Sequence, residues 1–394
     1  MAPVYLNDLG IICALGSGKA AVAEALFAAD APRGVAMVRR HGSNQVLALG
    51  AVNRSLPSLA ALPSRLRGRT NAMLQVALEE IRPQVDAAID RFGTSRVAVV
   101  LGTSTAGMVE SERAQRFHAE HGYWPDDFDY VQRELGSPSQ FLSHLLGVSG
   151  PAYSVSTACT ASTKAMASAA RLLLAGLADA VVTGGVDSLC DMTIAGFSAL
   201  EAVAPIRCNP FSLHRNGINI GEGAALFVLT REPGVVRLAG WGESSDAYHM
   251  SAPDPAGRGA SSALRDALQS AGVGAGAIDY INLHGTATMA NDAMESKVVA
   301  EVSGLSTASS STKPLTGHAL GAAGAIDAAL CWLTLVNNAQ GYLPPHWWDG
   351  VADPTLPTLH MVAPGELSPR PLRYLLSHNF AFGGSNAALV LGAG

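Results

Sequence analysis

Charged side chains are scarce in this chain of 394 residues: Asp, Glu, Lys and Arg make up 15%, whereas hydrophobic residues make up 48%. This composition excludes an intrinsically disordered chain and predicts a compact globular protein. The net charge of −6 argues against a general nucleic-acid-binding function. The length exceeds what a single hydrophobic core usually supports, so we expect two packed domains or a duplicated α/β unit.

Cysteine is rare as well, and the five cysteines occur singly without a CxxC spacing. This pattern argues against a zinc site or a disulfide framework and predicts reduced thiols in a cytoplasmic protein. The first residues lack a basic segment and contain Asp8, so they predict a strand, a turn and a helix rather than a signal peptide. Residues 135–163 hold no charged residue, but Ser, Thr, Gly and Pro are frequent among them, so we expect buried structure rather than a membrane span.

Short runs rich in β-branched residues alternate along the chain with alanine-rich helical patterns, which predicts a layered α/β architecture. The predicted strands are residues 96–104, 152–158, 179–185, 224–230, 280–286 and 387–393, and the clearest predicted helices are residues 162–176, 260–272 and 319–336. A turn at Pro233-Gly234 separates two strand patterns. We therefore divide the chain into an N-terminal half, residues 1–233, and a C-terminal half, residues 234–394.

One cysteine occupies a position that permits two interpretations. In "VSTACTASTKAMASAA", residues 155–170, Cys159 lies between a predicted strand and a predicted helix. Amide groups at a helix N-terminus can stabilise a thiolate, so Cys159 could be a nucleophile. Free cysteine is also among the most buried residue types, and taken alone the local pattern favours a buried structural residue.

Three later segments hold further candidates for chemistry. His284 leaves a predicted strand in "NLHGTATMANDAMES", and Lys313 and His318 lie five residues apart in "SSTKPLTGHALGAAGAID". In "SHNFAFGGSNAALVL", Gly383-Gly384 allows the backbone to approach a ligand closely. Taken alone, each segment also fits an ordinary turn at the end of a strand.

Taken together, the order and spacing of these segments resemble the β-ketoacyl-[acyl-carrier-protein] synthase family, the elongating condensing enzymes of fatty-acid and polyketide synthesis. The resemblance spans most of the chain, and its motifs are "TACTAS", "GGVDSLC", "PFSLHRNGINIGEGAA", "SSDAYHMSAPDP", "HGTATMAND", "TKPLTGHALGAAG" and "NFAFGGSN". It implies the thiolase-like fold, with two similar halves that each contain a mixed five-stranded sheet, five αβαβα layers in all, and a dimeric assembly. The active site is then expected where the halves meet.

The resemblance also implies roles for individual residues. Cys159 matches the nucleophile that accepts the acyl chain from the phosphopantetheine arm of acyl carrier protein (ACP). His284 and His318 match the histidines that stabilise the enolate formed when malonyl-ACP loses CO2, a task that suits neutral imidazoles. Lys313 and Glu295 match a lysine and a carboxylate, which we expect to form a buried ion pair that organises the histidines.

The remaining site residues are likewise expectations from the resemblance. The backbone amides of Cys159 and Phe382 match the oxyanion hole, and Phe382 also matches the gate between the nucleophile and the malonyl pocket. Apart from the pantetheine arm, we expect no cofactor and no metal. The expected contacts are Thr286 and Thr288 for the arm, Thr105, Met192 and Phe197 for the acyl pocket, and Arg65, Arg67 and Arg69 for ACP docking. These arginines fit an ordinary solvated turn equally well.

Three residues depart from the common family pattern, namely Asn216, Ala287 and Ala381, and Ala381 is expected to stiffen the gating loop. The segment 197–210 is also short, which resembles synthases of aryl-polyene or other specialised polyene pathways. A degradative thiolase would need a second cysteine near the C-terminus, and a papain-like hydrolase would not explain Lys313 beside two histidines. The alternative from another class is a chain-length-factor-like partner subunit, although such partners typically lack the nucleophile; a heterodimer with such a partner is a further expectation.

Overall fold

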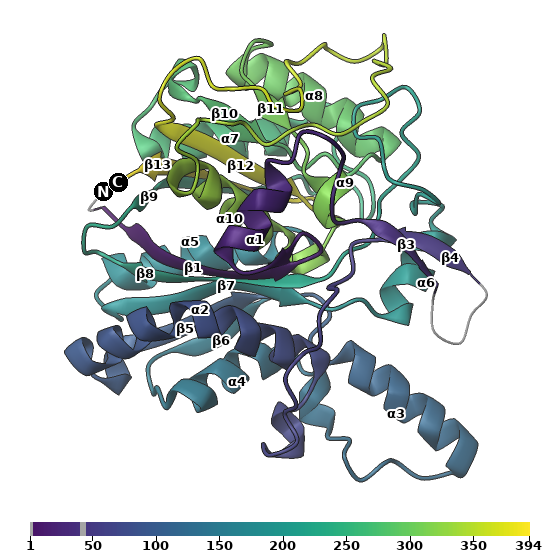
Figure 1. Ribbon diagram of the computed structural model, residues 1–394, viewed down its shortest axis with the longest axis vertical. Coiled ribbons are helices and arrows are strands. Elements are labelled where there is room, and N and C mark those ends of the chain that lie inside the picture. The colour runs from purple at the N-terminus through teal and green to yellow at the C-terminus, as the bar shows by residue number, and fades with distance from the viewer. Residues whose placement is uncertain (1–2, 40–44) are drawn as a thin grey trace.

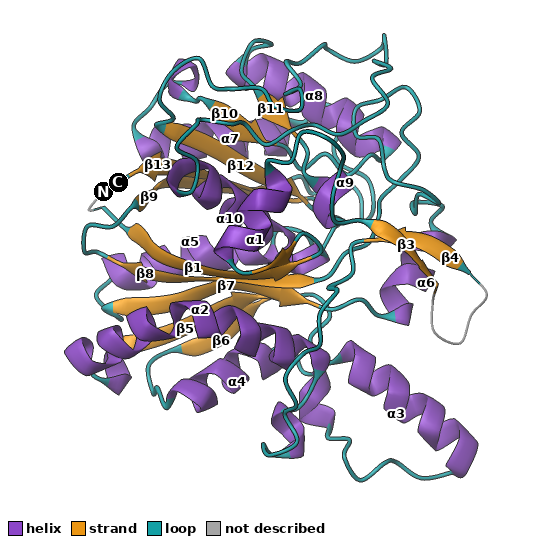
Figure 2. Cartoon of the chain, in the orientation of Figure 1, coloured by secondary structure: helices purple, strands orange, loops and turns teal. Residues whose placement is uncertain are grey.

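The computed structural model describes residues 3–39 and 45–394, in which strands and helices alternate (Figures 1 and 2). The strands are β1 (Tyr5–Cys13), β2 (Gly16–Ser17), β3 (Ala36–Arg39), β4 (Val46–Leu49), β5 (Val97–Gly102), β6 (Ala152–Val155), β7 (Ala180–Asp187), β8 (Gly223–Thr230), β9 (Val236–Ser245), β10 (Tyr280–Asn282), β11 (Ser309–Ser310), β12 (Tyr374–Phe380) and β13 (Ser385–Ala393). The α-helices are α1 (Lys19–Leu26), α2 (Arg69–Phe92), α3 (Met108–His121), α4 (Ser137–Leu146), α5 (Ala161–Leu174), α6 (Asp191–Ala199), α7 (Arg258–Ala271), α8 (Met289–Ser303), α9 (Lys313–Thr316) and α10 (Ala323–Val336). The strands and helices expected from the sequence are confirmed with shifted ends, whereas the long helix α2 was not among them.

Two five-stranded mixed sheets form the framework, in the orders β1-β8-β7-β5-β6 and β9-β13-β12-β10-β11. From β1 or β9 outward, each sheet has two antiparallel pairings followed by two parallel ones. The sheets join through two paired positions only, Tyr5 with Arg237 and Leu6 with Val236. The same pairing pattern in both halves confirms the expected thiolase-like duplication.

Helices and sheets stack in five layers (Figure 1). Helices α2 and α4 cover the outer face of the first sheet, and α7 and α8 cover the outer face of the second. Helices α5 and α10 lie between the sheets, and α1 packs against α10 there. The α–β–α–β–α order matches the fold that the resemblance implied.

Close packing between the two central helices depends on small residues. A Cβ atom at Gly324 on α10 would lie only 2.0 Å from Thr163 Oγ1 on α5, so a larger residue there would push the two helices apart. The alanine-rich sequence of α5 likewise keeps most of its residues buried against its neighbours. Because α5 starts just after Cys159 and α10 starts just after His318, this contact also sets the spacing of the two candidate catalytic residues.

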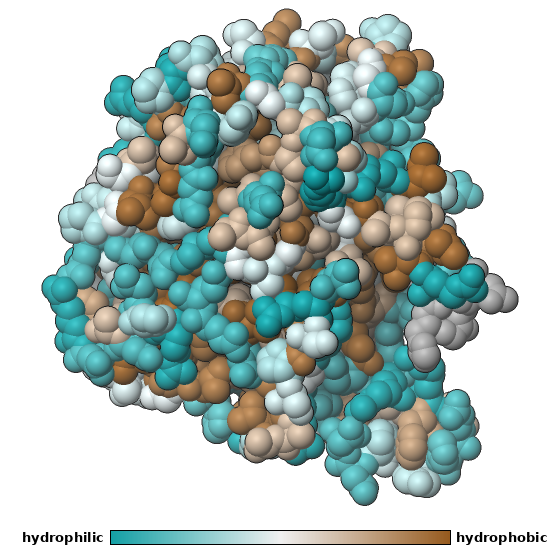
Figure 3. Space-filling model, in the orientation of Figure 1, coloured by the Kyte–Doolittle hydropathy of each residue, from teal (hydrophilic) through white to brown (hydrophobic). Residues whose placement is uncertain are grey.

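Outside the layered body, α3 projects from the N-terminal half, and α6 and the β3–β4 hairpin lie to one side (Figure 1). Apolar side chains gather at the surface near this hairpin (Figure 3), and its exposed Met37 and Val46 belong to that surface. Among the described residues, no helix combines the length and the hydropathy that crossing a bilayer would require.

Candidate active site

Cys159 lies in a tight turn between β6 and α5. The preceding residue, Ala158, has a φ of 50°. Residues other than Gly, Asn and Asp rarely adopt this left-handed conformation. Such strained residues persist where the surrounding structure fixes them, and they cluster at functional sites. The turn places the thiol of Cys159, which is 6% exposed, at the wall of a cavity between the two halves.

The cavity has a volume of about 220 Å³ and receives side chains from both halves of the chain. The residues that line it are Cys159, Phe197, Leu200, Ala202, Ile218, Ser251, Pro253, His284, Thr286, Thr288, Ala290, Asn291, His318, Phe380, Ala381, Phe382 and Asn386. Most of this lining is apolar, while the sulfur and the two imidazoles supply the groups for chemistry. The cavity is therefore suited to an apolar ligand that lies beside the thiol and the imidazoles.

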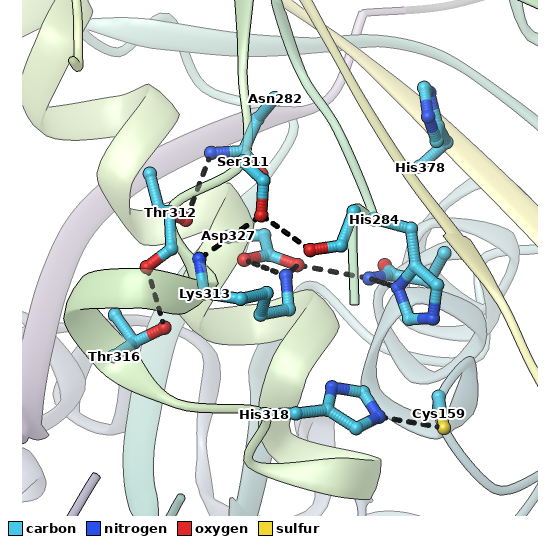
Figure 4. Close-up of polar contacts among 12 residues, drawn as sticks. Cys159, Asn282, His284, Ser311, Thr312, Lys313, Thr316, His318, Asp327 and His378 are labelled. Carbon is cyan, nitrogen blue, oxygen red and sulfur yellow. Dashed lines mark hydrogen bonds and ion pairs between the residues drawn. The ribbon is translucent and has the colours of Figure 1, made fainter. Parts of the chain in front are cut away.

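His284 and His318 reach the cavity from two separate turns. His284 follows β10, His318 follows α9, and their ring centroids lie 5.2 Å apart at an interplanar angle of 82°. His318 Nε2 lies 3.0 Å from Cys159 Sγ (Figure 4). The structure thus brings together the three residues that the sequence placed far apart.

Burial controls the protonation of all three groups. It lowers the pKa of His318 to about 3, with a further contribution from the positive charge of Lys313. Burial and the neighbouring His318 hold the pKa of His284 well below its usual value. Both imidazoles are consequently neutral at pH 7.

The thiol of Cys159 is likewise neutral at rest. Burial raises its pKa to about 12, although hydrogen bonds from the backbone of Phe382 and of Cys159 itself, and the charge of Lys313, act in the opposite direction. The thiolate-stabilising effect that we considered for a helix N-terminus is thus outweighed by burial. Any reaction in which this sulfur acts as a nucleophile must therefore remove the thiol proton, and His318 Nε2 is the adjacent acceptor.

The expected ion pair between Lys313 and Glu295 is wrong. Lys313 Nζ instead donates to both carboxylate oxygens of Asp327, at 3.0 and 2.9 Å, and both side chains are at most 2% exposed (Figure 4). Asp327 is in the second turn of α10, directly beside the lysine. Glu295 lies on α8 and is occupied by other donors.

Glu295 organises the loop that holds His284 without contacting Lys313. Its carboxylate accepts hydrogen bonds from the backbone N–H groups of His284, at 2.7 Å, and Gly285, at 2.8 Å. It also accepts from Asn291 Nδ2 and from His378 Nε2, at 2.9 and 2.6 Å. The carboxylate therefore fixes the backbone from which the His284 ring projects.

Asn379, at the end of β12, connects several parts of the site and was not expected from the sequence. Its Nδ2 donates to Asp327 Oδ2 at 2.9 Å and lies 3.4 Å from His284 Nδ1. Its Oδ1 accepts a hydrogen bond of 2.6 Å from Thr163 on the nucleophile's helix. The available signal was the polar pair His378-Asn379 at the end of an otherwise apolar strand.

The predicted substrate-contact residues separate into two groups. Thr286 and Thr288 line the cavity, and Phe197 lines it with its ring centroid 5.5 Å from that of Phe382. Thr105 and Met192, the other two residues expected in the acyl pocket, are not among the residues that line this cavity. Thr105 is buried and donates to Asp187 at 2.8 Å, and Met192 is 49% exposed on the surface of α6.

The arginine cluster also differs from the expected docking patch. Arg65 is exposed, whereas Arg67 is half-buried and donates to the carbonyl oxygen of Leu62 at 2.7 Å. Arg69 is bound to the buried carboxylate of Glu222, with Nε donating at 2.8 Å. Arg69 is therefore a structural cation rather than a free docking residue, because Glu222 already neutralises it.

The residues that depart from the family pattern have contrasting positions. Asn216 is exposed, and Ala287 is buried with a φ of 63°, just after the loop that holds His284. Ala381 lines the cavity, and its N–H donates to the carbonyl of Ser385 at 2.8 Å across the turn that holds Phe382. All three leave the contact between sulfur and imidazole in place.

A buried cysteine and two neutral histidines at the junction of two duplicated α/β halves define a condensing enzyme of the thiolase-like class. Residues 45–233 match the family described as "Beta-ketoacyl synthase, N-terminal domain", and residues 235–347 match "Beta-ketoacyl synthase, C-terminal domain". The chain belongs to the β-ketoacyl synthase family and is an acyltransferase-type condensing enzyme.

Relatives agree with this assignment over nearly the whole chain. Nodulation protein E of Rhizobium meliloti is 31% identical over 402 residues, and 3-oxoacyl-[acyl-carrier-protein] synthase 2 of Coxiella burnetii is 29% identical over 411; each alignment covers 98% of both chains. Among solved structures, "Ketosynthase (ApeO) in Complex with its Chain Length Factor (ApeC) from Xenorhabdus doucetiae" has a TM-score of 0.92 and 42% identity, covering 100% of this chain and 98% of that chain. "The ishigamide ketosynthase/chain length factor" has a TM-score of 0.86 and 27% identity, covering 100% and 99%.

Proposed function

We propose that Cys159 and His318 carry out the acyl transfer that starts each condensation. The thiol sulfur attacks the thioester carbonyl of acyl-ACP while its proton moves to His318 Nε2; the bond from the acyl carbon to the pantetheine sulfur then breaks, and His318 passes the proton to that sulfur, which leaves as the thiol. The observation that supports this step is the 3.0 Å contact between Sγ and a neutral imidazole in a largely apolar cavity. In this proposal the backbone N–H groups of Cys159 and Phe382 stabilise the oxyanion, which is supported by the hydrogen bonds of both backbones to the Cys159 thiol.

The second half of the reaction uses the histidines as neutral hydrogen-bonding groups. Malonyl-ACP loses CO2 to give an enolate, and His284 and His318 stabilise the oxygen on which the negative charge develops. The enolate carbon then forms a bond to the acyl carbonyl, the bond to Cys159 breaks, and 3-oxoacyl-ACP is released. Lys313 and Glu295 act through position: the lysine through its pair with Asp327, and the glutamate through the loop of His284.

In this proposal the phosphopantetheine arm and the acyl group both lie in the cavity beside Cys159. Thr286 and Thr288 offer hydroxyl groups to the phosphopantetheine arm, which arrives on ACP, so the chemistry needs no resident cofactor. Phe197 and Phe382 border the acyl end. We assign the acyl group to a specialised polyene pathway, supported by the short segment 197–210 and by the 42% identity to a ketosynthase that is paired with a chain length factor.

A second subunit of the same fold completes the assembly in this proposal. The outer edge of the C-terminal sheet is covered by the chain itself, because Ser309 on β11 bonds to both His360 and Val362. The corresponding edge of the N-terminal sheet, β6, has no further strand beside it in the described residues, and Ala152 on it is exposed. An open edge strand is a template for pairing with another chain. Arg65 offers an exposed cation to the acidic ACP, and all five cysteines are free, as expected of a cytoplasmic enzyme.

Intact-protein mass spectrometry tests the proposed function. Wild type, Cys159→Ala and the matched core variant Cys13→Ala are incubated with a panel of acyl-ACPs. We expect an acyl adduct on wild type and Cys13→Ala but not on Cys159→Ala, and the best donor identifies the chain. Folded wild type that acquires no adduct from any donor would overturn the catalytic assignment and favour a chain-length-factor-like subunit.

A further inference from the structure

The sulfur and the two imidazoles of the active site also form a set of metal ligands. Within residues 3–39 and 45–394, Cys159, His284 and His318 are the one group of three such side chains whose ligand atoms all lie within 4.8 Å of one another. All three are buried, and all three line the same cavity. Thiolate and imidazole together are the ligands that Zn²⁺ prefers.

The distances are close to those that a tetrahedral ion needs. Bonds of about 2.3 Å to sulfur and about 2.0 Å to nitrogen place the ligand atoms of a tetrahedral site about 3.3 to 3.6 Å apart. Cys159 Sγ and His318 Nε2 already lie 3.0 Å apart, and the two rings face each other edge to face. The remaining ligand–ligand distances are within 4.8 Å, so the side chains must move together to close the site around an ion.

The protonation and charge of the surroundings also permit a cation. Among the described residues, His318 Nδ1 has no hydrogen-bond partner. No donor to Nδ1 therefore holds the ring proton on Nε2, and Nε2 is free to bind a metal. The nearest cation, Lys313, is paired with Asp327 at 2.9 Å, which balances its charge. The Asp327 carboxylate therefore offsets part of the lysine charge that a Zn²⁺ ion would meet.

We infer that Cys159, His284 and His318 bind a thiophilic divalent cation of the Zn²⁺ type, and that this binding blocks the active site. On binding, the S–H bond breaks, the proton passes to solvent, and the sulfur electron pair forms the bond to the metal, with no change of oxidation state. The fourth coordination position faces the cavity. The ion occupies the space in which the thioester carbonyl would lie, so metal binding and acylation exclude each other.

Binding of Co²⁺ alone to the full chain, followed by absorption spectroscopy and equilibrium dialysis, tests this inference without reference to catalysis. We expect one Co²⁺ per chain, with a near-ultraviolet band from sulfur-to-metal charge transfer, and displacement of Co²⁺ by Zn²⁺. In Cys159→Ala the band disappears, and in Cys159→Ala and His318→Ala the affinity falls about tenfold or more. The variant Cys13→Ala, which removes an equally buried sulfur on β1, retains wild-type binding.

Three results would overturn the inference: no Co²⁺ bound to folded wild type, a spectrum without the sulfur band, or unchanged stoichiometry and affinity in Cys159→Ala. The last result would assign the metal to surface histidines instead. Circular dichroism confirms that each variant is folded, and Cys159→Ser provides a second variant of nearly unchanged size. A catalytically inactive protein that still binds Co²⁺ through sulfur would contradict the proposed function but not the metal site.

Discussion

Removal of the carboxylate of Asp327 tests the central ion pair of the site. Asp327 is 1% exposed and accepts hydrogen bonds from both Lys313 Nζ and Asn379 Nδ2. In Asp327→Ala the ammonium group of Lys313 remains buried without a counter-charge, and the amide loses its acceptor. Breaking a buried ion pair in this way costs about 3 to 5 kcal/mol in the free energy of unfolding.

An exposed pair on α2 provides the matched control. Arg82 and Asp86 are four residues apart on one face of the helix, and their side chains are 42% and 48% exposed. Solvent screens this pair, so Asp86→Ala should change the free energy of unfolding by less than about 1 kcal/mol. The contrast between the two aspartates isolates the effect of burial.

Urea unfolding followed by circular dichroism measures both variants, together with the double variant Lys313→Met/Asp327→Leu. The double variant removes both charges and fills their space with apolar atoms, so we expect it to recover most of the loss of the single variant. A loss below about 1 kcal/mol in Asp327→Ala would refute the reasoning, since it would mean that the lysine is solvated or neutral in the folded state. A double variant as unstable as the single one would refute it as well.

Other predictions concern docking, protonation and the acyl pocket. Arg65→Glu should raise KM for acyl-ACP without changing Tm, whereas Arg69→Glu should lower Tm because it places a second carboxylate beside a buried one; equal effects on KM would contradict this division. Burial lowers the pKa of His346 to about 4 from 6.5, so the unfolded chain binds a proton between these pH values that the folded protein does not, and stability falls as the pH falls through this range. His346→Gln should remove a slope of up to about 1.4 kcal/mol per pH unit from urea-unfolding data collected across this range, and an unchanged slope would show that another group titrates there. Phe197→Ala should lengthen the acyl chains accepted in a competition assay, with the exposed Met192→Ala as control, and identical product profiles would exclude Phe197 from the pocket wall.

The sequence predicted the elements and the reacting groups better than it predicted the contacts among buried polar residues. The alternation of strands and helices, and the positions of Cys159, His284 and His318, depend on local patterns that a single chain displays. The partner of Lys313 depends instead on how α10 packs against the loop before it, so the resemblance pointed to Glu295 and Asp327 was not expected. The network of Asn379 could not be predicted because it joins groups more than fifty residues apart.

The acyl pocket shows the same limit. Thr105, Met192 and Phe197 were expected in the acyl pocket from the positions of their motifs alone, and of the three only Phe197 lines the cavity beside Cys159. Thr105 is buried and bonded to Asp187, and Met192 is exposed on the surface of α6. Helix α2 was not predicted, and its interior contains Pro83, a residue type that weakens a helix. Its buried face continues past Pro83, so packing on the sheet stabilises the helix there.

The open edge of β6 makes the fate of a newly synthesised chain depend on its surroundings. Its free N–H and C=O groups would pair with any exposed strand they meet, and in a concentrated solution of this chain alone that strand belongs to another copy. Aggregation and correct assembly thus compete for the same few backbone groups. If the second subunit proposed above covers this edge, the yield of folded enzyme should respond to when, and in what ratio, that subunit is synthesised beside it.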